Sequence, residues 1–331
     1  MPAPFRFWQG LTHHRPGIPG PAGYLIAFLL SVFPGLMPGQ VNTLPGHYSE
    51  KAALFRNRVE YDSSLHYFIK ARDLLIQAGN KKALAEAELN ICDVYTLQRN
   101  YPMALNGLLN FKRMVGLEFP KDELLLADYC QVLGSYHLAL GRLDSSKVFL
   151  QKALRIRELQ TGKEDTLLHY AYNKLGNLFL AESDYDSAFL CHSKALELAR
   201  SKSNPINYLS ASSYQNLGIA AHLRGDYNLA ERFYTNSLKI KELLFGESNV
   251  ALAKIYNNIG KFYMDLSKYD SALTYYDKAE WILNKAQSTD ELLFSHVYIN
   301  KGNIYTTKGD YEKSISYLQK SLSIRDRKSV V

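Results

Sequence analysis

The chain has 331 residues, 47% of them apolar, which is long enough and apolar enough for a continuous buried core. Its net charge of +7 is modest and its Lys and Arg residues are dispersed, whereas a nucleic-acid-binding face gathers them. Composition therefore argues against nucleic-acid binding. The cysteines form no Cys-x-x-Cys pair and no disulfide pattern, so we expect all three to pack in the core: Cys92, Cys130 and Cys191.

Residues 1–45 are predicted to be a leader that precedes the folded domain. Within it, Tyr24–Phe33 (YLIAFLLSVF) is an apolar run with a basic region before it and a Pro-Gly pair after it. That order is typical of a secretory signal peptide, and the run is too short for a comfortable membrane span. We therefore expect an exported protein, periplasmic or anchored to the membrane through the leader. The alternative is a cytosolic chain whose leader is unstructured.

From about residue 85 to residue 325 the sequence repeats every 42 residues. The marker position, which is the glycine of a Tyr-x-x-x-Gly block, falls at Gly176, Gly218, Gly260 and Gly302, and Gly134 and Cys92 continue it backwards. A second marker, aromatic or leucine, falls at Tyr101, Leu143, Tyr185, Tyr227, Tyr269 and Tyr311, and an earlier copy at Tyr61 is offset by 40. Such self-similarity predicts a solenoid of stacked units, which we place at residues 46–325.

Each unit has the pattern of two helices joined by a turn. Around Gly260, apolar and small residues recur at i, i+3, i+4 and i+7, which is one helical face, and a second such face begins at Tyr269. Turns are expected at Gly225-Asp226, Ser267-Lys268 and Gly309-Asp310. Glycine inside a helix costs about 1 kcal/mol relative to alanine, so its recurrence predicts close approach of the paired helix. The fold class is therefore all-α, an α-solenoid of about seven helix-turn-helix repeats.

Three blocks carry a family resemblance: YNKLGNLFLAESDYDSAFLCHSKALEL from Tyr172, YQNLGIAAHLRGDYNLAERFYTNSLKI from Tyr214, and YNNIGKFYMDLSKYDSALTYYDKAEWI from Tyr256. This pattern resembles the tetratricopeptide repeat and covers residues 48–325. The 42-residue unit is similar to the long variety found in kinesin light chains, whereas the usual period is about 34, and the closing proline is missing. The resemblance implies that the solenoid is a right-handed superhelix with the first helix of each unit lining the concave side. It also implies a non-catalytic scaffold that binds a protein or extended peptide.

The candidate binding residues lie on that concave side. Two positions before the marker stand Asn90, Val132, Lys174, Asn216, Asn258 and Asn300. The resemblance implies that such asparagines form a ladder that binds a peptide backbone, because an amide both donates and accepts. The alternative is that they are solvated or bonded to neighbouring helices. The basic members favour an acidic segment or a free C-terminal carboxylate. The predicted groove consists of Asn90, Lys174, Asn177, Asn216, Lys254, Asn258, Lys261, Asn300 and Asn303.

No catalytic motif stands in the sequence: it lacks His-Glu-x-x-His, Gly-x-Ser-x-Gly, a phosphate-cradling glycine loop and a cluster with metal-ligand spacing. The nine histidines are scattered, and those at repeat positions, His137, His192 and His222, are expected in the core. We therefore predict a protein that is not an enzyme, with no catalytic residue, cofactor or metal.

The last six residues, 326–331, are predicted to be a non-native tail, because one possible coding sequence for them matches a widely used sequencing adapter. On that interpretation the chain is a fragment. The alternative function is then the sensory or regulatory region of a larger bacterial signalling protein that continues into a caspase-like peptidase, a histidine kinase or a DNA-binding regulator. A third possibility is a structural spacer, whose groove residues would tolerate any substitution.

Overall fold

The computed structural model describes residues 38–160, 166–201, 206–288 and 290–329. Within these ranges the chain forms helices and no strand, and the helices are arranged in seven pairs. The pairs are α2 (Pro38–Asn57) with α3 (Tyr61–Ala78), α4 (Lys81–Leu97) with α5 (Tyr101–Glu118), α6 (Glu123–Ala139) with α7 (Leu143–Gln160), α8 (Thr166–Ala181) with α9 (Tyr185–Arg200), α10 (Tyr208–Arg224) with α11 (Tyr227–Phe245), α12 (Val250–Asp265) with α13 (Tyr269–Lys285), and α14 (Glu291–Thr307) with α15 (Tyr311–Ser329).

The helices extend past both ends of the span predicted for the repeat array. Helix α2 begins at Pro38, within the predicted leader, and α15 continues to Ser329, through most of the predicted tail. The apolar run Tyr24–Phe33, on which the expected export depends, lies outside the described residues. Among the helices of the described part, none is both long enough and apolar enough to cross a membrane.

Each pair reverses direction through one residue with a left-handed backbone, a common way to end a helix. The φ angles of these residues lie between 58° and 87°, and after the first turn they recur every 42 residues: Val59, Arg99, Gly141, Ser183, Gly225, Ser267 and Gly309. The turns predicted at Gly225, Ser267 and Gly309 are confirmed. Val59 is the exceptional member, because a β-branched residue is strained in this region.

The two helices of a pair approach most closely at the marker position. A Cβ on Gly218 would lie 2.6 Å from Cδ1 of Tyr234, and one on Gly260 would lie 2.6 Å from Cε1 of Tyr276. In the second pair the arrangement is reversed, since Cys92 holds the marker position and a Cβ on Gly107 of α5 would lie 2.5 Å from its Sγ. The close approach that the recurring glycine predicted is confirmed.

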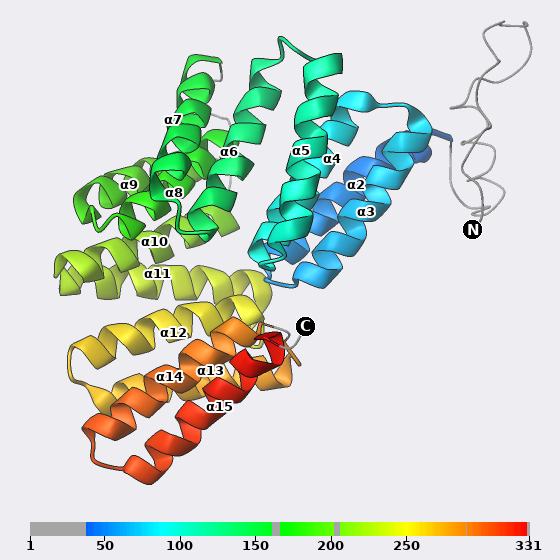
Figure 1. Cartoon of the computed structure of the whole chain (residues 1–331). Helices are drawn as coiled ribbons and strands as arrows, with labels where there is room; N and C mark the ends of the chain where they lie inside the picture. The colour runs from blue at the N-terminus through cyan, green and yellow to red at the C-terminus, as the bar shows by residue number, and fades with distance from the viewer. Residues whose placement is uncertain (1–37, 161–165, 202–205, 289, 330–331) are drawn as a thin grey trace, which may run out of the picture.

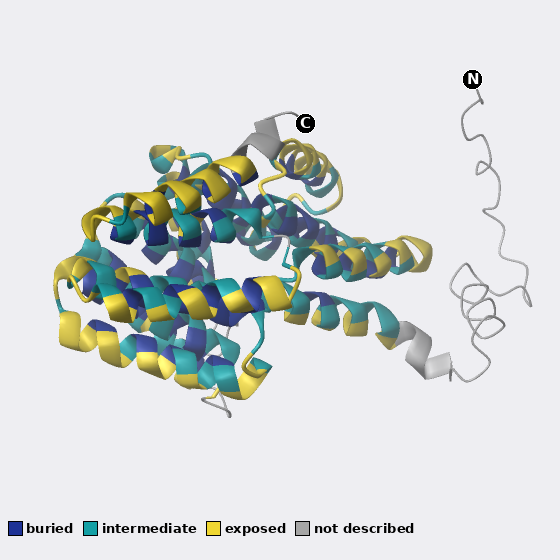
Figure 2. Cartoon of the chain, turned by 90° about the horizontal axis from the view of Figure 1, so that it is seen from below, coloured by how far each residue is buried: buried dark blue, intermediate teal, exposed yellow. Residues whose placement is uncertain are grey.

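The core runs along the stack between successive helices, and Figure 2 shows buried residues on the helix faces turned toward their neighbours. All three cysteines are buried with free thiols, as expected. Of the histidines at repeat positions, His192 and His222 are buried, while His137 is half-buried and stacks on Phe149 with ring centroids 5.5 Å apart.

The stack curves strongly, so that the turn between α2 and α3 returns to the fifth and sixth pairs (Figure 1). Lys254 Nζ of α12 donates to the hydroxyl of Tyr61 at 3.0 Å, and Asn249 Nδ2 lies 3.5 Å from Glu60 Oε1. Val59 packs against the core cluster built around α10 to α14. The first pair therefore closes one side of the concave surface.

Alanine substitutions at two helical glycines test the close approach of the paired helices at the marker position. Gly260→Ala is expected to lower the free energy of unfolding by roughly 1–3 kcal/mol, because the added methyl group would overpack against the buried ring of Tyr276. Gly116→Ala in α5 meets no atom within 4 Å and is expected to raise stability by about 1 kcal/mol, from helix propensity alone. Urea unfolding followed by circular dichroism measures both, and changes of the same sign would contradict the steric account.

Candidate functional site

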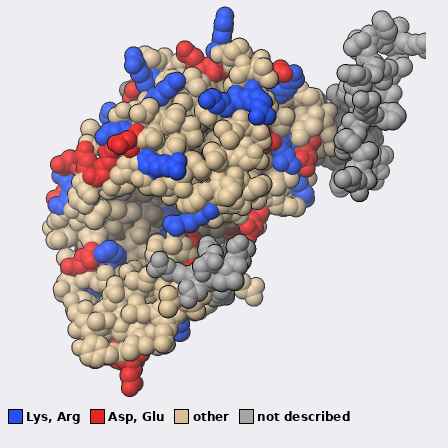
Figure 3. Space-filling model, in the orientation of Figure 1, with Lys and Arg blue, Asp and Glu red and all other residues tan. Residues whose placement is uncertain are grey.

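A cavity of about 520 Å³ lies on the concave surface, enclosed between the first pair and the inner helices of the following pairs. Helices α4, α6, α8, α10 and α12 contribute most of its lining, so the first helix of each unit faces the concave side, as the sequence predicted. The lining mixes amides, hydroxyls and charges of both signs with a few apolar side chains. On the face drawn in Figure 3, Lys and Arg are likewise interspersed with Asp and Glu.

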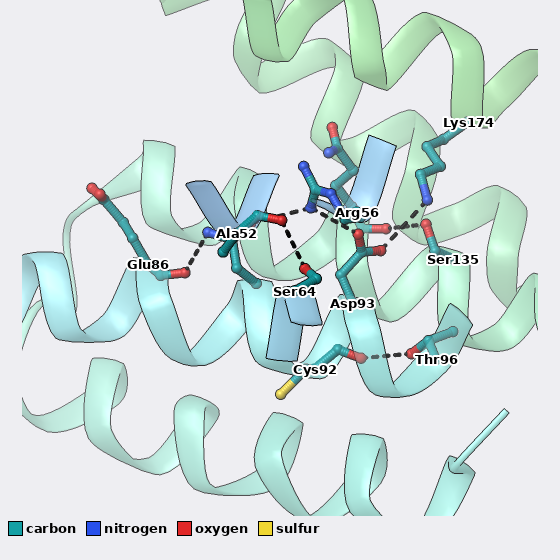
Figure 4. A network of polar contacts seen from close by, with 11 residues as sticks. Ala52, Arg56, Ser64, Glu86, Cys92, Asp93, Thr96, Ser135 and Lys174 are labelled. Carbon is teal, nitrogen blue, oxygen red and sulfur yellow. Dashed lines mark hydrogen bonds and ion pairs between the residues drawn. The ribbon is translucent and has the colours of Figure 1, made fainter. Parts of the chain in front are cut away.

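An ion-pair network anchors the first pair to the cavity wall (Figure 4). Asp93 of α4 accepts from Arg56 of α2 at 3.1 Å and lies 3.5 Å from Lys174 Nζ of α8. Arg56 also donates to Asn90 Oδ1 at 3.3 Å. Burial alone would raise the pKa of Asp93, but the charges of Lys174 and Arg56 outweigh burial and lower it. The carboxylate therefore stays ionised and joins three units across the curve.

A second polar cluster lies under the cavity where the fourth and fifth pairs meet. Asn173 Oδ1 accepts from Asn216 Nδ2 at 3.2 Å and lies 2.9 Å from Nδ1 of His192. Its Nδ2 lies 2.9 Å from Nε2 of His169 and 3.3 Å from Ser213 Oγ. Burial, with a smaller effect of His169, lowers the pKa of His192 to about 3, so its ring is neutral near pH 7. The cluster fixes the orientation of the Asn216 amide at the cavity edge.

The structure brings five of the nine predicted groove residues to this cavity: Asn90, Lys174, Asn177, Asn216 and Lys254. Asn258 lines a neighbouring hollow of about 480 Å³, which also contacts Lys254. The remaining three, Lys261, Asn300 and Asn303, line neither space. Lys261 pairs with Asp265 at 3.0 Å on its own helix, and Asn300 Nδ2 donates to Asn257 Oδ1 at 3.2 Å.

Three of the predicted asparagines bond within the protein, which is the alternative that the sequence left open. Asn216 and Asn300 each donate to an asparagine of the preceding unit, and Asn90 Nδ2 donates to the carbonyl of Glu86 at 2.9 Å. The acceptors Asn173 and Asn257 were not among the predicted residues. Their signal was present, because the position three before the marker is an amide in four successive units: Gln131, Asn173, Gln215 and Asn257.

Sequence reasoning also missed Lys241 of α11, a second helix of its pair that was not expected to reach the concave side. Lys241 lines the cavity although it is only 4% exposed, and its Nζ donates to Gln215 Oε1 at 2.5 Å. Burial, with a smaller contribution from the charge of Lys254, lowers the pKa of Lys241 from 10.5 to about 7.

Nothing in the described ranges groups three or more His, Cys, Asp or Glu side chains as a metal site would. The thiols are also poorly suited to nucleophilic chemistry, since burial raises the pKa of Cys92 to about 12 and that of Cys191 to about 11. What the cavity offers is a set of fixed amides, hydroxyls and cations, which suits binding.

Models of the tetratricopeptide repeat match residues 127–158, 167–243 and 251–327, together more than half of the chain. The chain belongs to the tetratricopeptide repeat family. The predicted family and the predicted all-α solenoid are thereby confirmed, and the architecture is that of a protein-binding repeat scaffold. No match was found among the curated proteins.

Solved structures agree with this fold. The chain is similar to a Rap protein complexed with Competence and Sporulation Factor, with TM-score 0.65 and 12% identity over 91% of this chain and 79% of that one. It is similar to apo RapI, with TM-score 0.59 and 14% identity over 87% and 99%. BtubC (BKLC) from P. vanneervenii matches with TM-score 0.54 and 23% identity over 70% and 92%. At these identities the likeness concerns the fold alone.

Lys241→Met tests the electrostatic cost of this buried cation. The change keeps most of the side-chain volume and removes the charge, so we expect the free energy of unfolding at pH 7 to rise by roughly 1–4 kcal/mol. Lys239→Met, an exposed lysine on the same helix, is the control and should shift it by less than about 0.5 kcal/mol.

The same variant has a pH signature. Between about pH 7 and pH 10.5, Lys241 is protonated in the unfolded chain and mostly deprotonated in the folded protein. The free energy of unfolding of the wild type therefore has a contribution that rises with pH across this window. Lys241→Met lacks this pH-dependent contribution, so the difference in free energy of unfolding between the variant and the wild type should shrink as pH rises. Urea titrations at several pH values measure the difference, and a pH-independent difference would contradict the lowered pKa.

Proposed function

We propose that the chain binds an extended peptide or protein segment in the concave cavity and performs no chemistry on it. The observation that carries this proposal is the cavity itself, a recess of about 520 Å³ whose walls are the inner helices of successive repeats. This volume lies within the range of recesses that enclose small ligands or a few residues of a peptide. A Rap structure of the same fold was solved with Competence and Sporulation Factor, which supports a ligand on this architecture.

The amides of Asn177 and Asn216 are suited to an extended backbone. An asparagine amide offers two hydrogens and an oxygen with two lone pairs, while a peptide unit presents one donor and one acceptor. Asn216 commits one hydrogen to Asn173 and keeps the rest of its capacity for a ligand. Because the hydrogen bond to Asn173 already fixes the orientation of the Asn216 amide, ligand binding would cost little additional side-chain entropy, which favours affinity.

The charges on the cavity wall favour an acidic partner. Three acidic side chains line the cavity, and two of them, Asp93 and Asp128, are already engaged in ion pairs with cations of the chain. The third, Glu86, is exposed to solvent. Lys241 and Lys254 also line the cavity, and of these two Lys254 lies 3.7 Å from Asp290. We therefore propose an acidic peptide and no nucleic acid, with export or membrane anchoring through the leader as an accompanying proposal.

A second candidate is the sensory or regulatory region of a larger signalling protein with a caspase-like peptidase, histidine kinase or DNA-binding domain. It is favoured by the outer face of α15, where Tyr311, Ile315 and Leu322 are 65%, 55% and 57% exposed. Leu318 on the same face is 38% exposed, while its equivalent in the preceding unit, Tyr276, is fully buried. Sequencing the source locus through the codon for Arg325 tests this candidate. An in-frame continuation into such a domain would support it, and a stop directly after Val331 would contradict it.

The peptide proposal is tested with a displayed library of linear peptides, followed by calorimetry on the selected peptide. Asn177→Ala with Asn216→Ala should weaken binding by about tenfold or more, because each lost hydrogen bond costs about 0.5–1.5 kcal/mol. The matched control is Asn300→Ala with Asn303→Ala, the same residue types at the same repeat positions outside the cavity.

The control pair should leave the affinity unchanged. Equal affinities for wild type and the Asn177/Asn216 variant, with circular dichroism showing intact helices, would contradict a role for these amides. A library that yields no peptide would favour the spacer interpretation.

A further inference from the structure

We infer that Lys241 is the centre of an anion-binding subsite in the cavity, and that this subsite takes a carboxylate of the bound peptide. The inference rests on the proposed function for the source of the carboxylate, but the subsite itself can be measured without any peptide. Lys241 was not among the residues that the repeat pattern predicted, and it lies on a second helix of its pair.

The first argument comes from the other buried cations. Three cationic side chains in the described part of the chain are buried, namely Arg157, Lys241 and Lys301. Arg157 pairs with Asp128, and Lys301 Nζ lies 2.7 Å from Asp277 and 2.6 Å from Glu280. A buried cation ordinarily needs such a partner, because removal from water is costly. Lys241 has a neutral amide, Gln215, and no carboxylate partner among the described residues.

The repeat supplies an internal comparison. Lys241 and Arg157 occupy the same position two units apart, and the position of Asp128 corresponds to Ser212. The third unit thus carries its own acid for the buried cation, whereas the fifth unit has a serine hydroxyl there. At the same position the fourth unit has Ala199 and the sixth Leu283, both buried. The fold therefore does not need a cation at this position, and an anion from outside the chain would stabilise the ammonium form of Lys241 as Asp128 stabilises Arg157.

The position of Lys241 makes it accessible to such a partner. The residue is 4% exposed and lines the cavity together with Gln215, Ser212 and Lys254, so a ligand in the cavity would lie beside it. Lys254 Nζ donates to the Tyr61 hydroxyl at 3.0 Å and lies 3.7 Å from Asp290, so its charge is already partly balanced. Lys241 uses one ammonium hydrogen for Gln215 and keeps the other two for a ligand. Burial and the charge of Lys254 lower the pKa of Lys241, and a bound anion would raise it again.

The chemistry of the subsite fits one oxyanion group. A lysine ammonium offers three hydrogens, of which one reaches Gln215, and the hydroxyl of Ser212 is a further donor on the same wall. A carboxylate would accept charge-assisted hydrogen bonds there and would supply the charge that Asp128 supplies in the third unit. A peptide C-terminus, an acidic side chain and a phosphate group share this chemistry, and the probes below separate them.

The experiment measures binding of four probes by calorimetry at constant ionic strength. They are inorganic phosphate, an acetylated oligoalanine with a free C-terminal carboxylate, the same oligoalanine amidated, and the amidated oligoalanine with one central glutamate. We expect wild type to bind a carboxylate-bearing peptide at least tenfold more tightly than the amidated oligoalanine. A preference for the free terminus or for the glutamate identifies the source, and binding of phosphate alone identifies an inorganic anion as the partner and overturns the carboxylate assignment.

Three variants make the result specific. Lys241→Met should reduce affinity for the anionic probe at least tenfold, while Lys239→Met removes an exposed lysine of the same helix and should leave it unchanged. Ser212→Asp should also abolish binding, because it restores the internal acid of the third unit and neutralises Lys241. Both cavity variants should melt at or above the wild-type temperature, which separates loss of binding from loss of fold.

Two results would overturn the inference: equal binding of every probe by wild type and Lys241→Met, or no binding of any anionic probe by wild type. These results are distinct from failure of the peptide proposal. If anion binding depends on Lys241 but no peptide is selected from the library, the subsite is supported and the proposed function is not. If a selected peptide binds wild type and Lys241→Met with equal affinity, the proposed function is supported and the subsite is not.

Discussion

The whole structure depends on how closely the two helices of each pair approach at the marker position. At Gly134, Gly176, Gly218, Gly260 and Gly302 an added Cβ would come within 2.5–2.9 Å of a side chain from the paired helix. A helix pair held this closely stacks as one unit. Each unit is rotated by a similar small angle relative to the preceding one, and these rotations add up to the curvature of the solenoid. The cavity exists because that curvature brings the first pair back to the fifth and sixth.

Most of the fold could be predicted because the same unit recurs along the sequence. Most of the site could not be predicted, because its contacts do not repeat from unit to unit. The period predicted the pairs and the turns at Gly225 and Ser267, since each depends on contacts within one unit, and the family resemblance implied that the first helices face inward. The contact between Tyr61 and Lys254 depends on the accumulated rotation over several units, which no local pattern encodes. Lys241 was missed for a related reason: a second helix reaches the concave side only where the curve closes upon it.

The buried polar residues fall into two groups, according to whether other residues of the chain supply their hydrogen-bond or ion-pair partners. Asn173 joins Asn216 and two histidines, and Asp93 joins two cations, so both groups hold neighbouring units in fixed positions. Hydrogen-bond and ion-pair networks of this kind favour one arrangement of the units over others. Lys241 differs, because its burial costs stability that a leucine at the same position, Leu283, does not cost. A residue that lowers stability without completing a network is best explained by a ligand.

Closure of the curve also decides what kind of segment the cavity would suit. In an open superhelix an asparagine at the same position of every unit could follow one long peptide, as the ladder hypothesis supposes. Here the turn at Val59 packs against the cluster around α10 to α14, and it does so at the expense of a left-handed β-branched residue. The cavity accordingly contacts Asn177 and Asn216 but not Asn300 or Asn303. A ligand confined to this recess would be short, and its specificity would come from a few fixed groups: the amides of Asn177 and Asn216 and the side chain of Lys241. A peptide bound along all seven units would therefore require the contact between Tyr61 and Lys254 to open.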